Sequence, residues 1–321
     1  MGLINVMNAK TGKVVIVGAG AVGSTFAYAL QIRGVVGEIV LLDMDKKLAQ
    51  GQAMDLNHGV FFTEPVNIHA GDYEDCAGAD IVVICAGAKQ EPGQSRMELV
   101  ATNVEICKQI VEKIVEHTTE SILLVVANPV DVLTYAALRF SKLPKQQVIG
   151  SGTVLDSARF RYLLSRHCLL DSRNVHAYVL GEHGDSEVPA WSIATHGGMN
   201  VLDCCKTCSR GCSQTDHAEI SKQVRESAYH IIEAKGATNF AVGLALVRIA
   251  TAIIRNENSV LTVSTLLNGQ YGISDVCLSV SVILNSDGVG RYICPELSAD
   301  ELAQLKTSAD AIKNVQQQVG L

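Results

Sequence analysis

The chain has 321 residues, of which 48% are hydrophobic, and it carries a formal net charge of −7. This length suffices for two domains of ordinary size, and the negative charge argues against nucleic acid or an anionic membrane as a partner. The longest apolar segment, 240–254, contains Arg248 and Thr251; it therefore predicts a buried helix rather than a membrane span, and we expect no secretory signal peptide.

Ten cysteines are spread along the chain, and several, such as Cys85 and Cys107, fall in patterns typical of buried strands and helices. This usage indicates reduced thiols and predicts a cytoplasmic protein. A group of four thiols within nine residues fits either a metal or redox site or incidental surface cysteines. We expect no metal, because the group lies in a polar stretch far from every other motif; it consists of Cys204, Cys205, Cys208 and Cys212.

From residue 13 to residue 150, predicted strands and helices alternate. Buried apolar runs predict strands at 14–18, 38–42, 80–85, 122–126 and 147–149, and a weaker one near 66–69. Helical periodicity predicts helices at 23–33, 46–58, 96–116 and 130–140. This alternation predicts an α/β fold with a doubly wound, Rossmann-type parallel sheet.

Beyond residue 150 the spacing of the predicted elements changes. Helices are predicted at 154–167, 214–235 and 239–255, and strands at 174–180 and 188–195. Three antiparallel strands are predicted at 258–267, 276–284 and 288–293. Ser298 and Glu301 have the spacing of a capping box that begins a final helix. We expect a dinucleotide-binding domain at 1–150 and a mixed α/β substrate domain at 151–321.

The segment from Val14 to Asp43 has the spacing of a dinucleotide-binding motif. Gly18 permits a tight turn after the first strand, Gly20 lets a pyrophosphate approach the backbone, and Gly23 lets the next helix pack on the strand. The N-terminus of that helix offers unpaired N–H groups to phosphates. Because Asp43 would bind ribose hydroxyls and repel the 2′-phosphate of NADP, the motif predicts NAD.

Asp156, Arg159 and His183 form a candidate catalytic group. Asp156 and Arg159 are three residues apart on a predicted helix and so share one face, while His183 lies in a glycine-flanked turn. A histidine held by a carboxylate is suited to proton transfer near neutral pH, and an arginine beside it can grip a substrate carboxylate. The same residues also fit a surface ion pair beside a structural histidine.

Arg96 ends a loop at 86–96 that contains both Pro92 and Gly93 and leads into a predicted helix. A loop of this kind after a strand of a nucleotide-binding domain can fold over a bound substrate. An ordinary solvated turn is the alternative.

Six segments together resemble the bacterial-type L-lactate dehydrogenases of the lactate and malate dehydrogenase family, and they span almost the whole chain. They are GAGAVGS at 18–24, AGAKQEPGQSR at 86–96, ANPVD at 127–131, GSGTVLDSARFR at 150–161, NVHAYVLGEHGDSEVPAWS at 174–192 and KGAT at 235–238. The resemblance implies interconversion of pyruvate and L-lactate by hydride transfer with NAD, in a homotetramer.

The resemblance also implies roles for individual residues. His183 would donate a proton in pyruvate reduction and accept it in lactate oxidation, with Asp156 orienting it. Arg159 would hold the substrate carboxylate, and Arg96 and Asn128 would contact the oxygen on the second carbon. Cofactor contacts would come from Gly18, Gly20, Val22, Gly23, Asp43, Tyr73, Gly87, Ala88, Ala127, Asn128, Ser151 and Val242.

Two further implications concern substrate choice and regulation. Gln90 occupies a position where malate dehydrogenases carry arginine, which favours pyruvate over oxaloacetate, and Thr238 would shape the same pocket. Arg161 and His176 match residues at a subunit interface where allosteric relatives bind fructose 1,6-bisphosphate; the alternative is that Arg161 is merely a solvated charge. A malate or other 2-hydroxyacid dehydrogenase, and a catalytically silent dinucleotide-binding protein, remain alternative functions.

Overall fold

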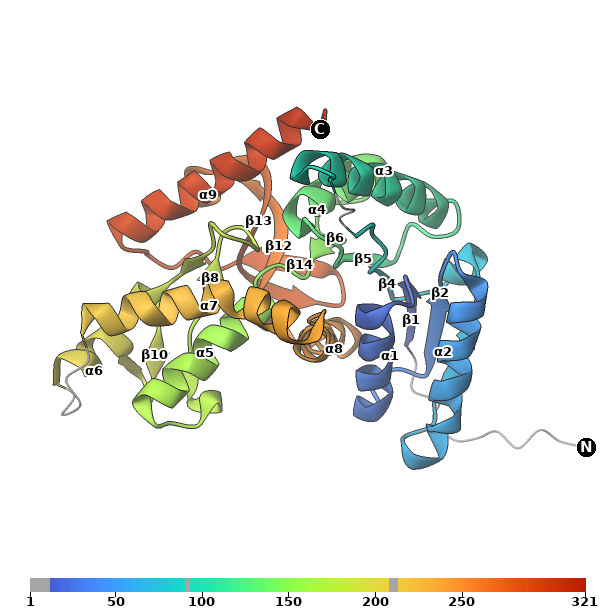
Figure 1. The fold of residues 1–321 in the computed structure, drawn as a ribbon, viewed down its shortest axis with the longest axis horizontal. Helices are drawn as coiled ribbons and strands as arrows, with labels where there is room; N and C mark the ends of the chain where they lie inside the picture. The colour runs from blue at the N-terminus through green and yellow to red at the C-terminus, as the bar shows by residue number, and fades with distance from the viewer. Residues whose placement is uncertain (1–11, 90–92, 208–212) are drawn as a thin grey trace, which may run out of the picture.

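The computed structural model describes residues 12–89, 93–207 and 213–321, and a nine-stranded sheet organises them (Figure 1). Six of its strands are parallel, in the order β3-β2-β1-β4-β5-β6. They are β1 (Lys13–Val17), β2 (Glu38–Leu42), β3 (Asn67–Ala70), β4 (Ile81–Ile84), β5 (Ile122–Val125) and β6 (Val148–Gly150). This is the strand order of a doubly wound dinucleotide-binding sheet, so the predicted Rossmann-type fold is confirmed.

Helices alternate with these strands as predicted. They are α1 (Ala21–Arg33), α2 (Lys46–His58), α3 (Arg96–Val115) and α4 (Val130–Ser141). Local capping explains two of the starts: the Asp45 side chain accepts hydrogen bonds from the first N–H groups of α2, and Ser95 forms a capping box with Glu98 at the start of α3. The predicted boundaries of all ten elements are within two residues of the observed ones.

The sheet continues beyond β6 into three antiparallel strands, β12 (Ser259–Asn268), β13 (Ser274–Asn285) and β14 (Gly288–Tyr292). The sequence predicts these strands but not their junction with the parallel sheet. At the junction Ser264 of β12 pairs with Gly150 of β6. A Cβ at Gly150 would lie 2.3 Å from the Thr134 hydroxyl oxygen, so only glycine lets α4 and β12 approach β6 this closely.

The prediction of one continuous strand at 174–180 and another at 188–195 is wrong, because the strand in each range is interrupted in the structure. The first divides into β7 (Val175–His176) and β8 (Val179–Leu180), and the second contains β9 (Val188–Pro189) and β10 (Thr195–His196). Strand β8 pairs with β9, whereas β7 joins β10 and β11 (Met199–Asn200) in a separate sheet. Side chains cause the break: Arg161 donates to the Ala177 carbonyl, and Ser157 accepts from the Val179 N–H.

The remaining helices are α5 (Val154–Cys168), α6 (Val201–Thr207), α7 (Gln214–Lys235), α8 (Phe240–Ile254) and α9 (Ala299–Gln318). Helix α6 lies in the cysteine-rich stretch and was not predicted, because this stretch has no apolar periodicity. The capping box at the start of α9 is confirmed: Ser298 accepts from the Glu301 N–H, and the Glu301 carboxylate accepts from the Ser298 N–H.

Helix α8 packs against both α1 and α5 (Figure 1). The sequence predicts a buried helix, but only one face is buried: Leu246 and Ile249 are fully buried, whereas Phe240 is 70% and Leu244 60% exposed. Among the described residues, no helix has both the length and the apolar composition needed to cross a membrane.

Candidate active site

The glycine-rich turn between β1 and α1 leaves room for a pyrophosphate. Gly18 has a φ of 105°, a conformation that favours glycine, and a Cβ at Gly23 would lie 2.0 Å from the Gly18 carbonyl oxygen. A Cβ at Gly20 would meet no atom within 4 Å, so the space beside it is open. Gly20 also precedes α1 without a side-chain cap, which leaves the first N–H groups of the helix available to an anion.

Asp43, directly after β2, is held beside this turn. Its carboxylate accepts hydrogen bonds from the Ala19 N–H at 2.8 Å and from the Asp45 N–H at 2.9 Å. Neither bond was predicted, and together they fix the direction of the carboxylate. A fixed carboxylate next to an open helix N-terminus fits the ribose and pyrophosphate of NAD.

Five of the other predicted cofactor residues follow the carboxyl ends of neighbouring strands. Gly87 and Ala88 follow β4, Ala127 and Asn128 follow β5, and Ser151 follows β6. In a doubly wound sheet this edge is where ligands bind. The topology therefore brings these residues to the same side as the glycine-rich turn.

Asn103 on α3 connects two of these loops and was missed in the sequence. Its side-chain oxygen accepts from the Ala88 N–H at 2.7 Å, and its side-chain nitrogen donates to the Asn128 carbonyl at 2.9 Å. Asn103 is 3% exposed, so these bonds are shielded from water and hold the loops after β4 and β5 in register.

The three remaining cofactor candidates come from separate elements. Val22 lies in the first turn of α1 and Val242 in the first turn of α8. The two helices are joined near their starts by a hydrogen bond of 2.9 Å from the side chain of Asn239, which precedes α8, to the hydroxyl of Thr25 on α1. Tyr73 begins a short 3-10 helix after β3, at the far edge of the parallel strands.

The candidate catalytic side chains meet at one buried carboxylate. Asp156, in the first turn of α5, accepts a hydrogen bond from an Arg159 guanidinium nitrogen at 2.7 Å, and its other oxygen lies 2.6 Å from Nδ1 of His183. The Asp156 side chain is 2% exposed and the His183 side chain 26%. The geometry therefore leaves the other ring nitrogen of His183, Nε2, free of this pair and able to face a reactant.

Hydrogen bonds hold the backbone of His183 as well as its ring. Its N–H donates to Asp131 at 2.8 Å, and the second oxygen of Asp131 accepts from the Ser264 hydroxyl at 2.6 Å. The neighbouring Glu182 N–H donates to the Ser308 hydroxyl at 2.8 Å. Asp131 lies in one of the motifs noted in the sequence, but its contact with His183 was not predicted; it spans 52 residues.

Charge coupling favours the ionised forms of this pair. Burial lowers the pKa of His183, but the Asp156 carboxylate, helped by Asp131 and Glu187, outweighs burial and raises the pKa to about 9. Burial raises the pKa of Asp156, but His183 and Arg159 outweigh it and hold the pKa below its usual value. An imidazolium that faces a reactant at neutral pH is a proton donor.

Arg96 lies apart from this cluster, at the start of α3. Its guanidinium is 3.9 Å from the carboxylate of Asp185, two residues beyond His183, and its side chain is 74% exposed. Asp185 also accepts a hydrogen bond of 2.7 Å from the hydroxyl of Tyr229 on α7. The structure thus brings Arg96 to the rim of the His183 hairpin, and neither Asp185 nor Tyr229 was singled out from the sequence.

Of the two residues predicted to set substrate choice, the structure describes only one. Gln90 lies outside the described residues, so its surroundings stay a prediction. Thr238 is half-buried in the connection between α7 and α8.

Comparison with known proteins gives matches to two domains of one family. Residues 12–150 match the lactate/malate dehydrogenase NAD binding domain, and residues 153–320 match the lactate/malate dehydrogenase alpha/beta C-terminal domain. The chain belongs to the lactate and malate dehydrogenase family.

Individual members of the family resemble the chain over nearly its whole length. An L-lactate dehydrogenase from Acetivibrio thermocellus is 52% identical over 94% of this chain and 96% of its own. One from Treponema denticola is 52% identical over 96% of this chain and 98% of its own. The crystal structure of MGS-M5, a lactate dehydrogenase from a deep-sea metagenome library, superposes with a TM-score of 0.95 at 45% identity and covers 97% of this chain and 100% of the other.

Membership of the lactate and malate dehydrogenase family makes the chain an NAD-dependent oxidoreductase, as the sequence predicts. The open glycine turn and the fixed Asp43 carboxylate are the features of this structure that suit the cofactor.

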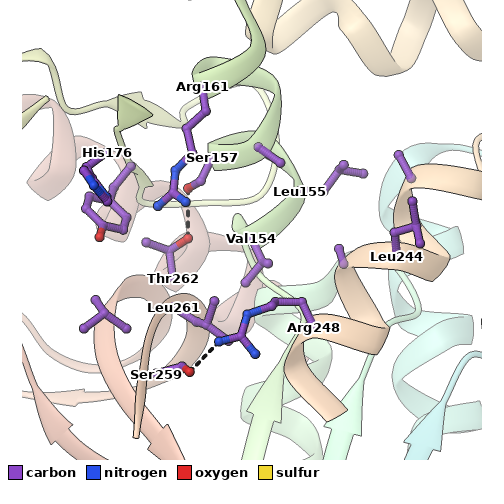
Figure 2. Close-up of a pocket in the computed structure, with 15 residues that line it drawn as sticks. Val154, Leu155, Ser157, Arg161, His176, Leu244, Arg248, Ser259, Leu261 and Thr262 are labelled. Carbon is purple, nitrogen blue, oxygen red and sulfur yellow. Dashed lines mark hydrogen bonds between the residues drawn. The ribbon is translucent and has the colours of Figure 1, made fainter. Parts of the chain in front are cut away.

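Arg161 and His176 line a pocket of about 500 Å³ on another face of α5 (Figure 2). The Arg161 guanidinium lies 5.0 Å from the centre of the Tyr178 ring, and its Nε donates to the Ala177 carbonyl at 2.9 Å. Arg248 of α8 also lines the pocket and forms an ion pair of 2.6 Å with Glu257. The predicted pair, Arg161 and His176, is thus joined in this pocket by a third basic side chain that was not predicted.

The cysteine cluster is described only in part. Cys204 and Cys205 lie on α6, while Cys208 and Cys212 fall outside the described residues. Within the described ranges, no group of three His, Cys, Asp or Glu side chains could hold a metal ion. The role of the cluster stays a prediction.

Proposed function

We propose that this protein is an L-lactate dehydrogenase that reduces pyruvate to L-lactate with NADH and catalyses the reverse reaction with NAD. The observation that carries the proposal is the Asp156 carboxylate that holds both Arg159 and His183. This arrangement places a cationic anchor for a carboxylate beside a proton donor, which is what reduction of a 2-keto acid requires.

In the proposed mechanism the substrate carboxylate binds Arg159 through two parallel hydrogen bonds. Nε2–H of His183 then faces the oxygen on the second carbon and donates its proton as that oxygen gains negative charge, so the carbonyl becomes a hydroxyl. The hydride that the second carbon accepts in the same reduction would come from NADH held by the glycine-rich turn and Asp43. Asp156 keeps the ring in the orientation that presents Nε2 and stabilises the imidazolium before the transfer.

Arg96 completes the proposed site when the loop that precedes it closes. Its present distance of 3.9 Å from Asp185 supports this role, because Asp185 belongs to the hairpin that carries His183. A guanidinium that reaches the carbonyl oxygen, next to the side chain of Asn128, would stabilise the charge that develops there. Closure would also remove water from the site and strengthen each of these interactions.

Substrate choice is tested by changing Gln90. A second carboxylate without a cationic partner costs several kcal/mol in a closed site, so the unmodified enzyme should prefer pyruvate to oxaloacetate by roughly a thousandfold in kcat/KM. Gln90→Arg supplies the missing charge and should raise kcat/KM for oxaloacetate by about 10²-fold or more while lowering that for pyruvate. Steady-state oxidation of NADH with both keto acids measures both effects.

Gln90→Met is the matched control, because it keeps the length of the side chain without adding charge. It should leave oxaloacetate turnover low. The placement of Gln90 is wrong if Gln90→Arg fails to raise kcat/KM for oxaloacetate. A preference of the unmodified enzyme for oxaloacetate would instead favour a malate dehydrogenase.

The pocket beside Arg161 is proposed as the site of an activating fructose 1,6-bisphosphate, at an interface of a homotetramer. Arg161, His176 and Arg248 line it from three elements (Figure 2), and clustered basic side chains favour the phosphate groups of a sugar bisphosphate. Because the effector would relieve repulsion between these cations, it should lower the KM for pyruvate by about tenfold.

A titration with fructose 1,6-bisphosphate, read by pyruvate KM and by light scattering, tests this proposal. Arg161→Gln should abolish the response, whereas Arg166→Gln, an exposed arginine on the same helix, should preserve it. An unchanged KM together with an unchanged oligomeric state would rule out the effector.

The proposal also covers the domain boundaries and the cellular location. We place the dinucleotide-binding domain at 1–150 and the substrate domain at 151–321, supported by the change from parallel to antiparallel pairing between β6 and β12. We assign the protein to the cytoplasm, supported by buried cysteines outside any disulfide at Cys76, Cys107 and Cys277.

A further inference from the structure

Glu187 is a buried acid in the active-site hairpin that the mechanism above does not use. It lies four residues after His183, in the connection between β8 and β9, and it is 5% exposed. Its Oε1 atom is fully buried and has no hydrogen-bond partner. Among the side chains of the described residues, it is the only carboxyl oxygen in this condition.

The hairpin holds Glu187 in place. Its N–H donates to the Gly184 carbonyl at 3.2 Å, and the next residue, Val188, pairs with Leu180 across the two strands. These contacts fix the backbone on both sides of Glu187 and so set the direction in which its side chain leaves the chain, into the interior where it is 5% exposed.

Charged groups from three elements act on Glu187. Asp156 and Arg159 reach it from α5, His183 from its own hairpin, and Arg225 from α7. No ion pair within 4.0 Å joins Glu187 to a cation in the part of the chain that the structure describes. The cations are thus near enough to act through charge, but none pairs with the carboxyl group directly.

An acid in these surroundings favours its neutral form. A buried carboxylate oxygen without a donor loses its hydration and gains nothing in return. Burial first, and then the negative charge of Asp156, raise the pKa of Glu187 to about 8, although His183, Arg159 and Arg225 oppose the shift.

We propose that Glu187 is a positioning residue that must keep its proton for the substrate anion to bind. In its neutral form it leaves the positive charges of Arg159 and His183 to the substrate carboxylate. When it ionises, its negative charge repels that carboxylate and competes for the same cations. This inference rests on the proposed function, and it adds a second proton to the requirements of substrate binding beside the proton on His183.

Glu187→Gln tests the inference, because glutamine has the same shape and no charge. With saturating NADH, the variant should match the unmodified enzyme within about twofold in kcat and pyruvate KM at pH 6.5. If one proton with a pKa of about 8 controls binding, the unmodified enzyme should lose a further factor of about ten in apparent affinity by pH 9. The ratio of KM at pH 9 to KM at pH 6.5 should therefore be about tenfold smaller in the variant, with kcat little changed.

Two further variants make the result specific to Glu187. Glu187→Asp keeps a titratable acid and should restore the steep rise of KM with pH. Glu182→Gln removes a carboxylate from the same hairpin, one that accepts a hydrogen bond from Ser186, and should keep the steep rise as well. A direct readout is proton uptake when oxamate, an unreactive isostere of pyruvate, binds the NADH complex at pH 8.5; the unmodified enzyme should take up more protons than Glu187→Gln.

The inference is overturned if Glu187→Gln keeps the full rise of KM with pH, or if both proteins take up equal numbers of protons. Failure of the proposed function looks different, because the unmodified enzyme would then fail to turn over pyruvate even at pH 6.5.

Discussion

Replacing His183 with glutamine should lower kcat for pyruvate reduction by about 10³-fold or more. Glutamine is polar and of similar length, and the backbone hydrogen bond from residue 183 to Asp131 does not depend on the side chain, so the fold of the hairpin should survive, but glutamine cannot transfer a proton. NADH binding should be unchanged, because His183 is not among the residues that surround the glycine-rich turn. Steady-state turnover and quenching of protein fluorescence by NADH measure the two quantities separately.

A matched control is His196→Gln, a histidine on β10 in the small three-stranded sheet. It should retain activity within about twofold. If His183→Gln kept a tenth or more of the original kcat, the proton would have to come from another group, and the proposed mechanism would be wrong.

The same proton sets the direction of the pH dependence. Burial lowers the pKa of His183 but Asp156 outweighs it, so the raised pKa of about 9 keeps the imidazolium form populated below that pH. In the Glu187→Gln background, kcat/KM for pyruvate should therefore fall as pH rises through the pKa of His183, which should lie below that of the unmodified enzyme because one of the acids that raise it is gone. Lactate oxidation needs the neutral ring, so its kcat/KM should rise over the same range.

Arg159→Lys has the second large expected effect. Lysine keeps the positive charge but loses the planar fork that binds a carboxylate through two parallel hydrogen bonds, and its ammonium cannot also hold Asp156 in the geometry observed at 2.7 Å. We expect kcat/KM for pyruvate to fall by about 10²- to 10³-fold, mostly through KM.

Arg166→Lys is the control for this change, since Arg166 lies on the same helix and is exposed. It should leave both kinetic constants within about twofold of their original values. Circular dichroism of both variants checks that α5 is intact. An unchanged pyruvate KM in Arg159→Lys would mean that the substrate carboxylate binds elsewhere.

The parallel half of the fold was predictable because its strands are buried on both faces. Such strands are continuous apolar runs, as in Val14–Val17 and Ile81–Ile84, and two of the helices between them, α2 and α3, begin at side-chain caps. The segment 174–195 failed for the opposite reason. Its strands are two residues long, and side chains from α5 take part of their backbone hydrogen bonding, which no local pattern reveals.

The candidate site was predictable where chemistry and spacing coincide, as for Asp156 and Arg159 on one helix face. His183 was grouped with these two residues as one of two interpretations, the resemblance to a known family favoured the catalytic one, and the structure shows the contact at 2.6 Å. Supporting contacts were not predictable, because the partners are far apart in the sequence. Asp131 binds His183 across 52 residues, and Ser264 binds Asp131 across 133 residues. Only the three-dimensional structure brings such pairs together.

The burial of Glu187 could not be predicted from the sequence for a similar reason. It occupies a polar position in a hairpin of charged residues, and nothing in its local pattern distinguishes it from the half-buried Glu182. The difference arises from packing, because Glu182 has a hydroxyl partner and Oε1 of Glu187 has none.

A crystal structure of the protein with NADH and oxamate tests the central proposal most directly. We expect Nε2 of His183 within about 3 Å of the oxamate carbonyl oxygen, with the oxamate carboxylate on Arg159 and the nicotinamide ring against the second carbon. A complex in which His183 points away from that carbon, or in which Arg159 leaves the carboxylate unbound, would contradict the proposed chemistry.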